Sequence, residues 1–271
     1  MKKLFLIAVA LFTAISFNAC TNDDHENGGS DGDTRIVSQI IQQNEDGTTV
    51  IYKFYYDDQG RVIRIHCDDY ATCFSYTAGQ VEITGSSITG NDDKYGTRSI
   101  HLATLNEHGY IATEDYLMYD NNNLIDRITG NYSYDKNGYL SEIWWDDKWD
   151  DNTLQCTWNN GDLISEHHTK GYYKGTYEYT NYPRKQNIDI FAVTGEYCYD
   201  NFDTFIGGTG LVGRKNAHPI KSANIEDESD NISLSYDYEL NDNGNPTKIT
   251  EFIMYKTISK HETRTYRIFY E

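Results

Sequence analysis

The sequence predicts an all-β protein: one large antiparallel meander sheet of consecutive hairpins, strongly twisted or curled, with one irregular insertion. Three observations carry this prediction. A hairpin unit rich in tyrosine and aspartate recurs along the chain, glycines fall where each unit must turn, and no long stretch has helical periodicity. The chain also contains only three prolines.

The clearest copy of the hairpin unit runs from Tyr132 to Ile143. Tyr132 and Tyr134 are two residues apart, so in a strand they point to the same face. Asp135 can accept hydrogen bonds from the backbone ahead of it, and Gly138 tolerates the positive φ that ends such a turn. A second strand then begins, and the unit reads as a β-hairpin.

Other copies vary the same scheme. Gln80 and Glu82 alternate with Val81 and Ile83, which predicts one wet face, and Asn160-Gly161 is a strong short hairpin signal. Further strands are expected at 35–41, 248–257 and 262–270. The copies lie at 54–65, 74–83, 104–111, 116–125, 156–164 and 236–246.

The spacing of the turn glycines separates two architectures. They fall at positions 60, 79, 109, 138, 161 and 244, so the period drifts. A solenoid needs equal rungs, whereas an antiparallel meander requires only that each hairpin pair with its neighbour. The meander is therefore favoured.

One segment, about 200–231, departs from the hairpin scheme and reads as an irregular insertion. It contains Gly207, Gly208, Gly210 and Gly213, and a short helical turn is expected near 203–206. Long loops on a β-scaffold often carry function.

The N-terminus reads as an export signal. Lys2 and Lys3 precede an apolar run that is shorter than the roughly 20 residues of a spanning helix. Ala19 before Cys20 resembles the lipobox of bacterial lipoproteins, although Phe17 and Asn18 depart from it. This resemblance implies a signal peptide at 1–19, cleavage before Cys20, lipidation of its thiol and anchoring in the outer membrane.

The segment 20–34 is acidic, glycine-rich and without apolar residues, so it reads as a flexible tether. Acid directly after a lipidated cysteine resembles the surface-export signal of lipoproteins from gut Gram-negative anaerobes, which implies the cell surface. The remaining 35–271 forms the β-sheet domain.

Charge excludes some partners. The chain has 23 basic and 42 acidic residues, and removing Lys2 and Lys3 with the signal leaves 21 − 42 = −21. Such a surface repels nucleic acid and anionic lipid. The acyl group on Cys20 would therefore be the membrane contact.

The repeated Tyr-x-Tyr-Asp-x-x-Gly unit, at 54–65, 132–143 and near Tyr236, resembles the tyrosine-aspartate (YD) repeats of the Rhs family. Together with the lipoprotein signal, it is more similar to an uncharacterised lipoprotein family of the Bacteroides group. Those proteins share a late Lys-Asn-x-x-Pro stretch, here 215–219, and a closing Tyr-x-Leu-x-x-x-Gly-x-Pro, here 238–246. The resemblance implies an antiparallel β-sheet domain over most of 36–271 and no activity.

Four cysteines follow Cys20, and an oxidising compartment permits disulfides. Cys67 and Cys73 flank a plausible bend and could form a bridge. Reduced, buried cysteines are an equal alternative. No CxxC motif supports a zinc or thioredoxin-type site.

A tryptophan–aspartate stretch is the best candidate for ligand binding. Consecutive Trp144 and Trp145 must face opposite sides of a strand, so one can leave the core. An exposed indole beside carboxylates suits stacking on a sugar ring or a protein contact, whereas core packing beside a solvated acidic turn is the structural alternative. The candidate residues are Trp144, Trp145, Trp149, Asp146, Asp147 and Asp150.

The sequence contains no recognisable motif for a nucleotide, metal or calcium site. The glycines before Arg214 lack the Gly-Lys-Ser/Thr of a phosphate loop, His167 and His168 would point to opposite faces, and the aspartates lack EF-hand spacing. No metal, cofactor or nucleotide site is therefore predicted.

The sequence favours a non-catalytic, lipid-anchored surface protein that binds a glycan or a partner protein. A structural or assembly component of the envelope, whose sheet edges meet another chain, is the alternative. A glycan hydrolase is less favoured because no catalytic motif stands out.

Overall fold

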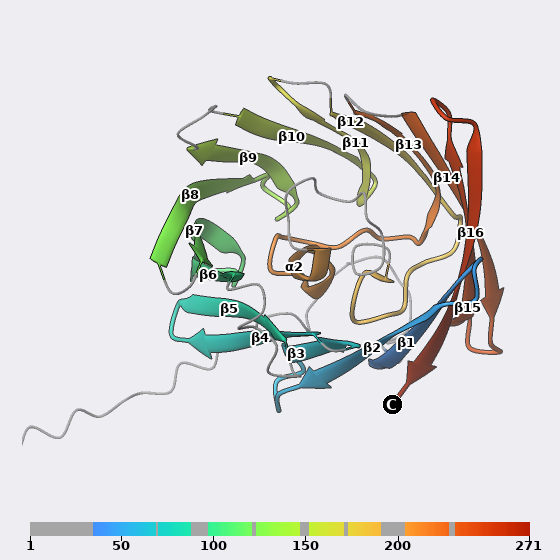
Figure 1. Cartoon of the computed structure of the whole chain (residues 1–271), viewed down its shortest axis with the longest axis horizontal. Coiled ribbons are helices and arrows are strands. Elements are labelled where there is room, and N and C mark those ends of the chain that lie inside the picture. The colour runs from blue at the N-terminus through green and yellow to red at the C-terminus, as the bar shows by residue number, and fades with distance from the viewer. Residues whose placement is uncertain are drawn as a thin grey trace, which may run out of the picture.

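The computed structural model describes residues 35–68, 70–87, 97–120, 123–146, 152–170, 173–190, 204–227 and 231–271. In these ranges sixteen antiparallel strands follow one another around a closed barrel, and β1 pairs with β16 (Figure 1). The predicted meander is confirmed, and its curl is completed into a cylinder. Every strand is paired on both edges, so the barrel leaves no strand edge for another chain.

The sixteen strands have the following bounds: β1 Val37–Asn44, β2 Thr49–Tyr56, β3 Val62–Cys67, β4 Tyr70–Thr77, β5 Gln80–Ser87, β6 Thr97–Leu105, β7 Ile111–Asp120, β8 Asn123–Tyr134, β9 Leu140–Asp146, β10 Asn152–Asn159, β11 Asp162–His168, β12 Lys174–Tyr179, β13 Ile220–Glu226, β14 Asn231–Leu240, β15 Pro246–Tyr255 and β16 Lys260–Tyr270.

The predicted hairpin turns form as expected. Asp135 Oδ1 accepts hydrogen bonds from the backbone N–H groups of Asn137 (2.8 Å) and Tyr139 (3.0 Å). Gly138 has a φ of 84° and donates to the Asp135 carbonyl at 3.0 Å. Asp57, Asn106 and Asn241 hold their turns in the same way. The side-chain acceptor and the positive-φ glycine together fix each reversal.

The second aromatic residue of the unit ties each hairpin to the one before it. Tyr134, at the end of β8, donates its hydroxyl to the Ile111 carbonyl at the start of β7, over 2.7 Å. Burial raises the pKa of Tyr134, so the phenol remains a donor. Equivalent bonds join Tyr56 to Val37, Tyr76 to Val62, Trp158 to Leu140, Tyr179 to Leu163, Tyr238 to Ile220 and Tyr270 to Pro246.

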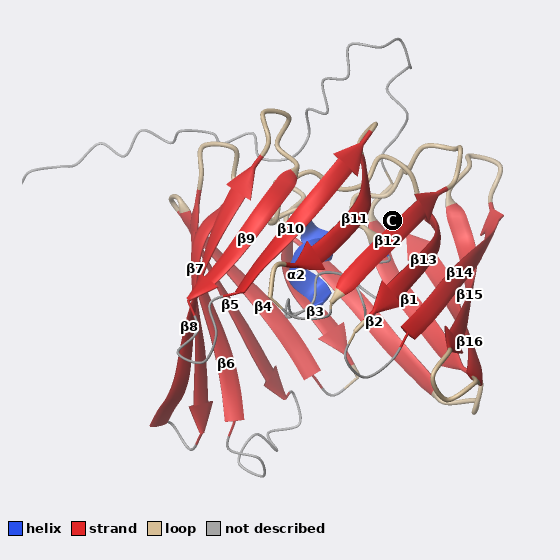
Figure 2. Ribbon diagram, turned by 90° about the horizontal axis from the view of Figure 1, so that it is seen from above, coloured by secondary structure: helices blue, strands red, loops and turns tan. Residues whose placement is uncertain are grey.

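Described parts of the chain between β12 and β13 lie inside the lumen of the barrel. We call residues 180–219 the plug; the structure describes 180–190 and 204–219 of it, including helix α2 (Thr204–Thr209). Both views place α2 inside the ring of strands (Figures 1 and 2). The helical turn expected near 203–206 is thus confirmed.

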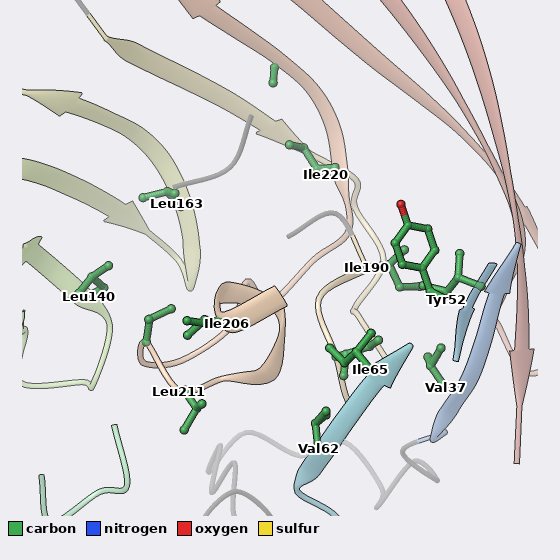
Figure 3. Packing of buried hydrophobic residues seen from close by; sticks show 14 of the residues in the cluster. Val37, Tyr52, Val62, Ile65, Leu140, Leu163, Ile190, Ile206, Leu211 and Ile220 are labelled. Atoms are coloured by element: carbon green, nitrogen blue, oxygen red, sulfur yellow. The ribbon is translucent and has the colours of Figure 1, made fainter. Parts of the chain in front are cut away.

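The plug completes the hydrophobic core. Ile206 is fully buried, and Leu211 and Ile190 are at most 6 % exposed. They lie inside the barrel with wall residues such as Leu140 and Ile65 (Figure 3). Because the strands turn their apolar side chains inward, the core of this barrel lies in its lumen.

Backbone hydrogen bonds fix the plug to the barrel at the end where the wall turns after β6, β8 and β10. Ile111 N–H donates to the Leu211 carbonyl at 2.8 Å, and Arg214 N–H donates to the Gly138 carbonyl at 2.9 Å. The Asn216 side chain accepts from Leu163 N–H at 2.9 Å. The plug therefore extends the hydrogen bonding of the wall and closes that end.

The predicted bounds of the insertion were partly wrong. It was expected at about 200–231 and does include the plug residues 204–219, but 180–190 also belong to the plug and Ile220–Glu226 is strand β13. That strand alternates buried and exposed residues over only seven positions and lacks the tyrosine-aspartate turn of the other hairpins. For these two reasons the sequence of β13 could not be told apart from the irregular segment before it.

Candidate functional site

Buried glutamates form a ring of polar contacts inside the barrel. Glu114 on β7, Glu166 on β11 and Glu251 on β15 are each at most 6 % exposed. A buried carboxylate is costly unless donors surround it. Each of these three receives hydrogen bonds from aromatic side chains of neighbouring strands.

The donors differ between the three sites. Glu114 contacts the His101 ring and the Tyr132 hydroxyl, and Glu166 accepts from Tyr173 at 2.6 Å and from Tyr177. Burial and the nearby Glu114 carboxylate raise the pKa of Tyr132 well above its usual range, so the phenol keeps its proton and donates. These donors offset the cost of burying the glutamates.

Glycines make room for two of these contacts. Gly130 pairs with Glu114 across the sheet, and Gly175 pairs with Glu166. A Cβ on Gly175 would lie 2.3 Å from the Tyr177 hydroxyl, and one on Gly130 would lie 3.2 Å from the Tyr132 ring. The tyrosine that follows each glycine by two residues, Tyr132 or Tyr177, thus lies over the glycine, and its hydroxyl reaches the glutamate.

These acid sites were missed in the sequence, although a signal was present. The two sites that contain a glycine share the sequence pattern Gly-x-Tyr-x-Tyr, at 130–134 and 175–179. The first tyrosine reaches the buried glutamate, and the second makes the carbonyl bond described above. The glutamates themselves lie 7 to 18 residues from their tyrosine donors, and no motif around them indicates the contact.

Over β12 to β14 the outer wall of the barrel is polar. Along β14, buried Ile232, Leu234 and Tyr236 alternate with outward Ser233 and Ser235. The outward positions of β12 to β14 are Lys174, Thr176, Glu178, Ser222, Asn224, Glu226, Asn231, Ser233, Ser235, Asp237 and Glu239.

Over β12 to β14 this wall lacks the outward apolar band of a transmembrane barrel, in which a Lys or Arg facing hydrocarbon costs about 2–4 kcal/mol at the midplane. Other strands carry exposed apolar side chains, such as Leu102 on β6 and Phe252 and Met254 on β15. Between the plug and the wall of β13 to β16, a cavity of about 30 Å³ has room for a water molecule rather than for a ligand. The geometry favours an outer-wall site.

The tryptophan pair divides between the two faces, as predicted. Trp145 points into the lumen, where it packs on the core and lies 5.8 Å from the His168 ring. Trp144 points outward from β9 and is 37 % exposed. It lies between Asn131 on β8 and Thr153 on β10.

Hydrogen-bonded polar groups lie on the same outer face as Trp144, on β7 to β10. On one side the Gln155 amide donates to the Glu142 carboxylate at 3.2 Å. On the other side Asp115 accepts from Thr129 at 2.9 Å and forms a two-bond ion pair with Arg127, at 2.7 and 3.0 Å. An indole framed by fixed donors and acceptors on a sheet face suits stacking with hydrogen bonding.

The other predicted site residues have mixed outcomes. Asp146 ends β9 and is exposed, on the same outer face as Trp144. Trp149, Asp147 and Asp150 lie outside the described residues, as do the predicted lipidation site Cys20, the signal peptide and the tether.

The possible bridge between Cys67 and Cys73 is not formed in the structure, in line with the alternative of reduced cysteines. Cys67 pairs with lumen-facing Tyr52, whereas Cys73 pairs with outward Arg64. The two side chains therefore point to opposite faces of the wall, which a disulfide cannot join.

No helix in the described part of the chain combines the length and the apolar character needed to cross a membrane. No group of three or more His, Cys, Asp or Glu side chains in the same residues is placed to hold a metal ion.

Comparison with solved structures finds the same fold. A porin-like protein from Bacteroides uniformis superposes with a TM-score of 0.62 and 18 % identity, covering 87 % of this chain and 98 % of that one. A porin-like protein from Bacteroides vulgatus gives a TM-score of 0.59 and 15 % identity, covering 87 % and 99 %.

No protein-family model matches the chain, and no curated protein matches it. The resemblance to YD repeats and to a lipoprotein family therefore finds no support in these comparisons. The solved structures instead identify a porin-like barrel fold.

Proposed function

We propose that this chain is a non-catalytic binding protein of the bacterial envelope, held at the cell surface by a lipid on Cys20. The exposed indole of Trp144 on the outer wall, set among fixed polar groups, is the observation that carries the binding role. The ligand class that suits it is a glycan, whose sugar rings stack on indole and whose hydroxyls bond to side chains.

The porin-like relatives of the fold and the export signal at the N-terminus support the envelope as the location. The polar wall and the filled lumen argue for a barrel that stands in water, with the acyl chain as its membrane contact. A polymer on the cell surface would then reach the wall of the barrel without entering it.

Trp144→Ala is expected to weaken glycan binding about tenfold, which corresponds to about 1.4 kcal/mol. Tryptophan fluorescence titrations against a panel of soluble oligosaccharides measure the affinity. Phe252→Ala is the matched control, because Phe252 is also exposed (43 %) but lies on β15, away from β9. A ligand that binds both variants as tightly as the unmodified protein would remove Trp144 from the site.

A further inference from the structure

A second region of the outer wall, over β16, β1, β2 and β3, gathers positive charge. Lys53 on β2 pairs across the sheet with His66 on β3, and Tyr55 pairs with Arg64 in the same two strands. Arg267 on β16 lies beyond β1, opposite Ile41. All of these positions alternate with buried residues, so their side chains point away from the lumen.

This wall carries no carboxylate at its outward strand positions. Those positions on β16 and β1 to β4 are His261, Thr263, Thr265, Arg267, Phe269, Gln39, Ile41, Gln43, Thr49, Ile51, Lys53, Tyr55, Arg64, His66, Ala71, Cys73, Ser75 and Thr77.

Carboxylates border this wall: Asp57 pairs with Arg61 in the β2–β3 turn, Asp68 accepts from Ile51 N–H, and Glu239 pairs with Lys248, the cross-strand neighbour of Arg267. In a chain with a formal charge of −19, several cations on strand positions that carry no carboxylate are conspicuous. Their mutual repulsion costs free energy that a bound anion would remove.

The cations of β2 and β3 are held in place. The Arg64 guanidinium lies 4.3 Å from the centre of the Tyr55 ring, and the Tyr55 and His66 rings meet edge to face at 5.1 Å. Burial, followed by Arg64 and Lys53, lowers the pKa of His66. The cross-strand neighbour of His66 on β4 is Ala71, which carries no charge that would offset the effect of Arg64 and Lys53 on this pKa.

A hollow adjoins these cations on the same wall. It has a volume of about 180 Å³ and is lined by Ile41, Gln43, Thr49, Thr265 and Arg267. The hollow thus combines the Arg267 guanidinium with the hydroxyls of Thr49 and Thr265, the amide of Gln43 and the apolar side chain of Ile41. The hollow is smaller than the roughly 300 Å³ of a drug-sized site, so it suits one small unit of a longer ligand.

We propose that the wall over β16, β1, β2 and β3 binds the oxyanion groups of an acidic polysaccharide. Arg267 receives a sulfate or carboxylate of one sugar unit in the hollow, and Lys53, Arg64 and His66 bind the next anionic group along the polymer. The arginines supply paired N–H donors that match the oxygens of such groups. The site is independent of Trp144, which lies on β9, six to eight strands away.

Affinity electrophoresis of the full chain, kept in detergent, tests this site. Gels contain dextran sulfate, polygalacturonate or neutral dextran as the probe. The protein is expected to be retarded by at least one charged polymer and not by neutral dextran. Retardation by only one charged polymer identifies its anionic group, sulfate or carboxylate, as the one bound.

The double variant Arg64→Gln with Arg267→Gln is expected to raise the dissociation constant at least tenfold. Its control, Lys174→Gln with Lys221→Gln, removes the same charge from exposed residues on the acidic wall and is expected to bind as the unmodified protein does. An equal loss in both variants would mean that bulk charge alone acts, and would overturn the proposal. Equal retardation by neutral dextran or by single-stranded DNA would overturn it too.

Discussion

Replacing Tyr236 and Tyr266 together by phenylalanine is expected to lower the free energy of unfolding by about 3–5 kcal/mol. Glu251 lies between them, only 2 % exposed, and accepts from Tyr236 at 2.8 Å and from Tyr266 at 2.6 Å. The double variant keeps the buried carboxylate but removes two of its donors. Urea unfolding followed by circular dichroism measures the loss.

A third substitution separates charge burial from packing. Adding Glu251→Gln to the double variant is expected to recover most of the lost stability, because a neutral amide costs less to bury than a carboxylate. Tyr70→Phe, at a residue that is 38 % exposed, is the control and is expected to change stability by less than about 0.5 kcal/mol. If the double variant unfolds at the same urea concentration as the unmodified protein, Glu251 does not depend on these phenols.

Gly213→Ala is expected to lower the free energy of unfolding by about 3 kcal/mol or more, because backbone strain and a steric clash add. Gly213 has a φ of 105°, and its Cβ would lie 2.9 Å from both the Gly138 carbonyl oxygen and the Tyr134 ring. The next residue, Arg214, makes the hydrogen bond that joins the plug to that turn. The substitution therefore loosens the plug from the wall.

Gly60→Ala is the matched control. Gly60 also has a positive φ, 75°, but no heavy atom lies within 4 Å of its Cβ position. We expect a loss of about 1–2 kcal/mol from the backbone conformation alone. The same urea experiment compares the two variants, and equal losses would show that the close approach of plug and wall contributes nothing.

The turns of this barrel could be predicted because their cause is local. The six glycines expected at turns all adopt φ between 73° and 87°. Asp135 and Asp57 accept the backbone bonds that their side chains were expected to accept. Tyr132 and Tyr134 face the same side because a strand has a period of two, and that side is the lumen.

Closure and the plug could not be predicted because their causes are distant in sequence. Pairing of Ile40 with Ile268 closes the ring across more than 200 residues, and no residue near either one indicates it. The plug depends on backbone bonds such as Ile111 to Leu211, which any residue could make. Local periodicity therefore gave a meander but not a filled cylinder.

The candidate site was predicted in part. Because consecutive residues of a strand face opposite sides of the sheet, Trp144 and Trp145 had to point in opposite directions. The sequence could not show which of the two faces water. The cationic wall was not foreseen because Arg267 joins the β2–β3 hairpin of Lys53 and Arg64 only through the closed ring. Cys67 and Cys73 were close in sequence, yet strand alternation places them on opposite faces.

Sedimentation velocity of residues 35–271 without detergent tests most directly whether this barrel is a filled, water-exposed domain. The polar outer wall and the apolar lumen predict a single species of monomer mass in plain buffer, with the circular-dichroism spectrum of a β-protein. Aggregates that disperse only when detergent or lipid is added would contradict it, because they would show that the outer wall needs hydrocarbon around it.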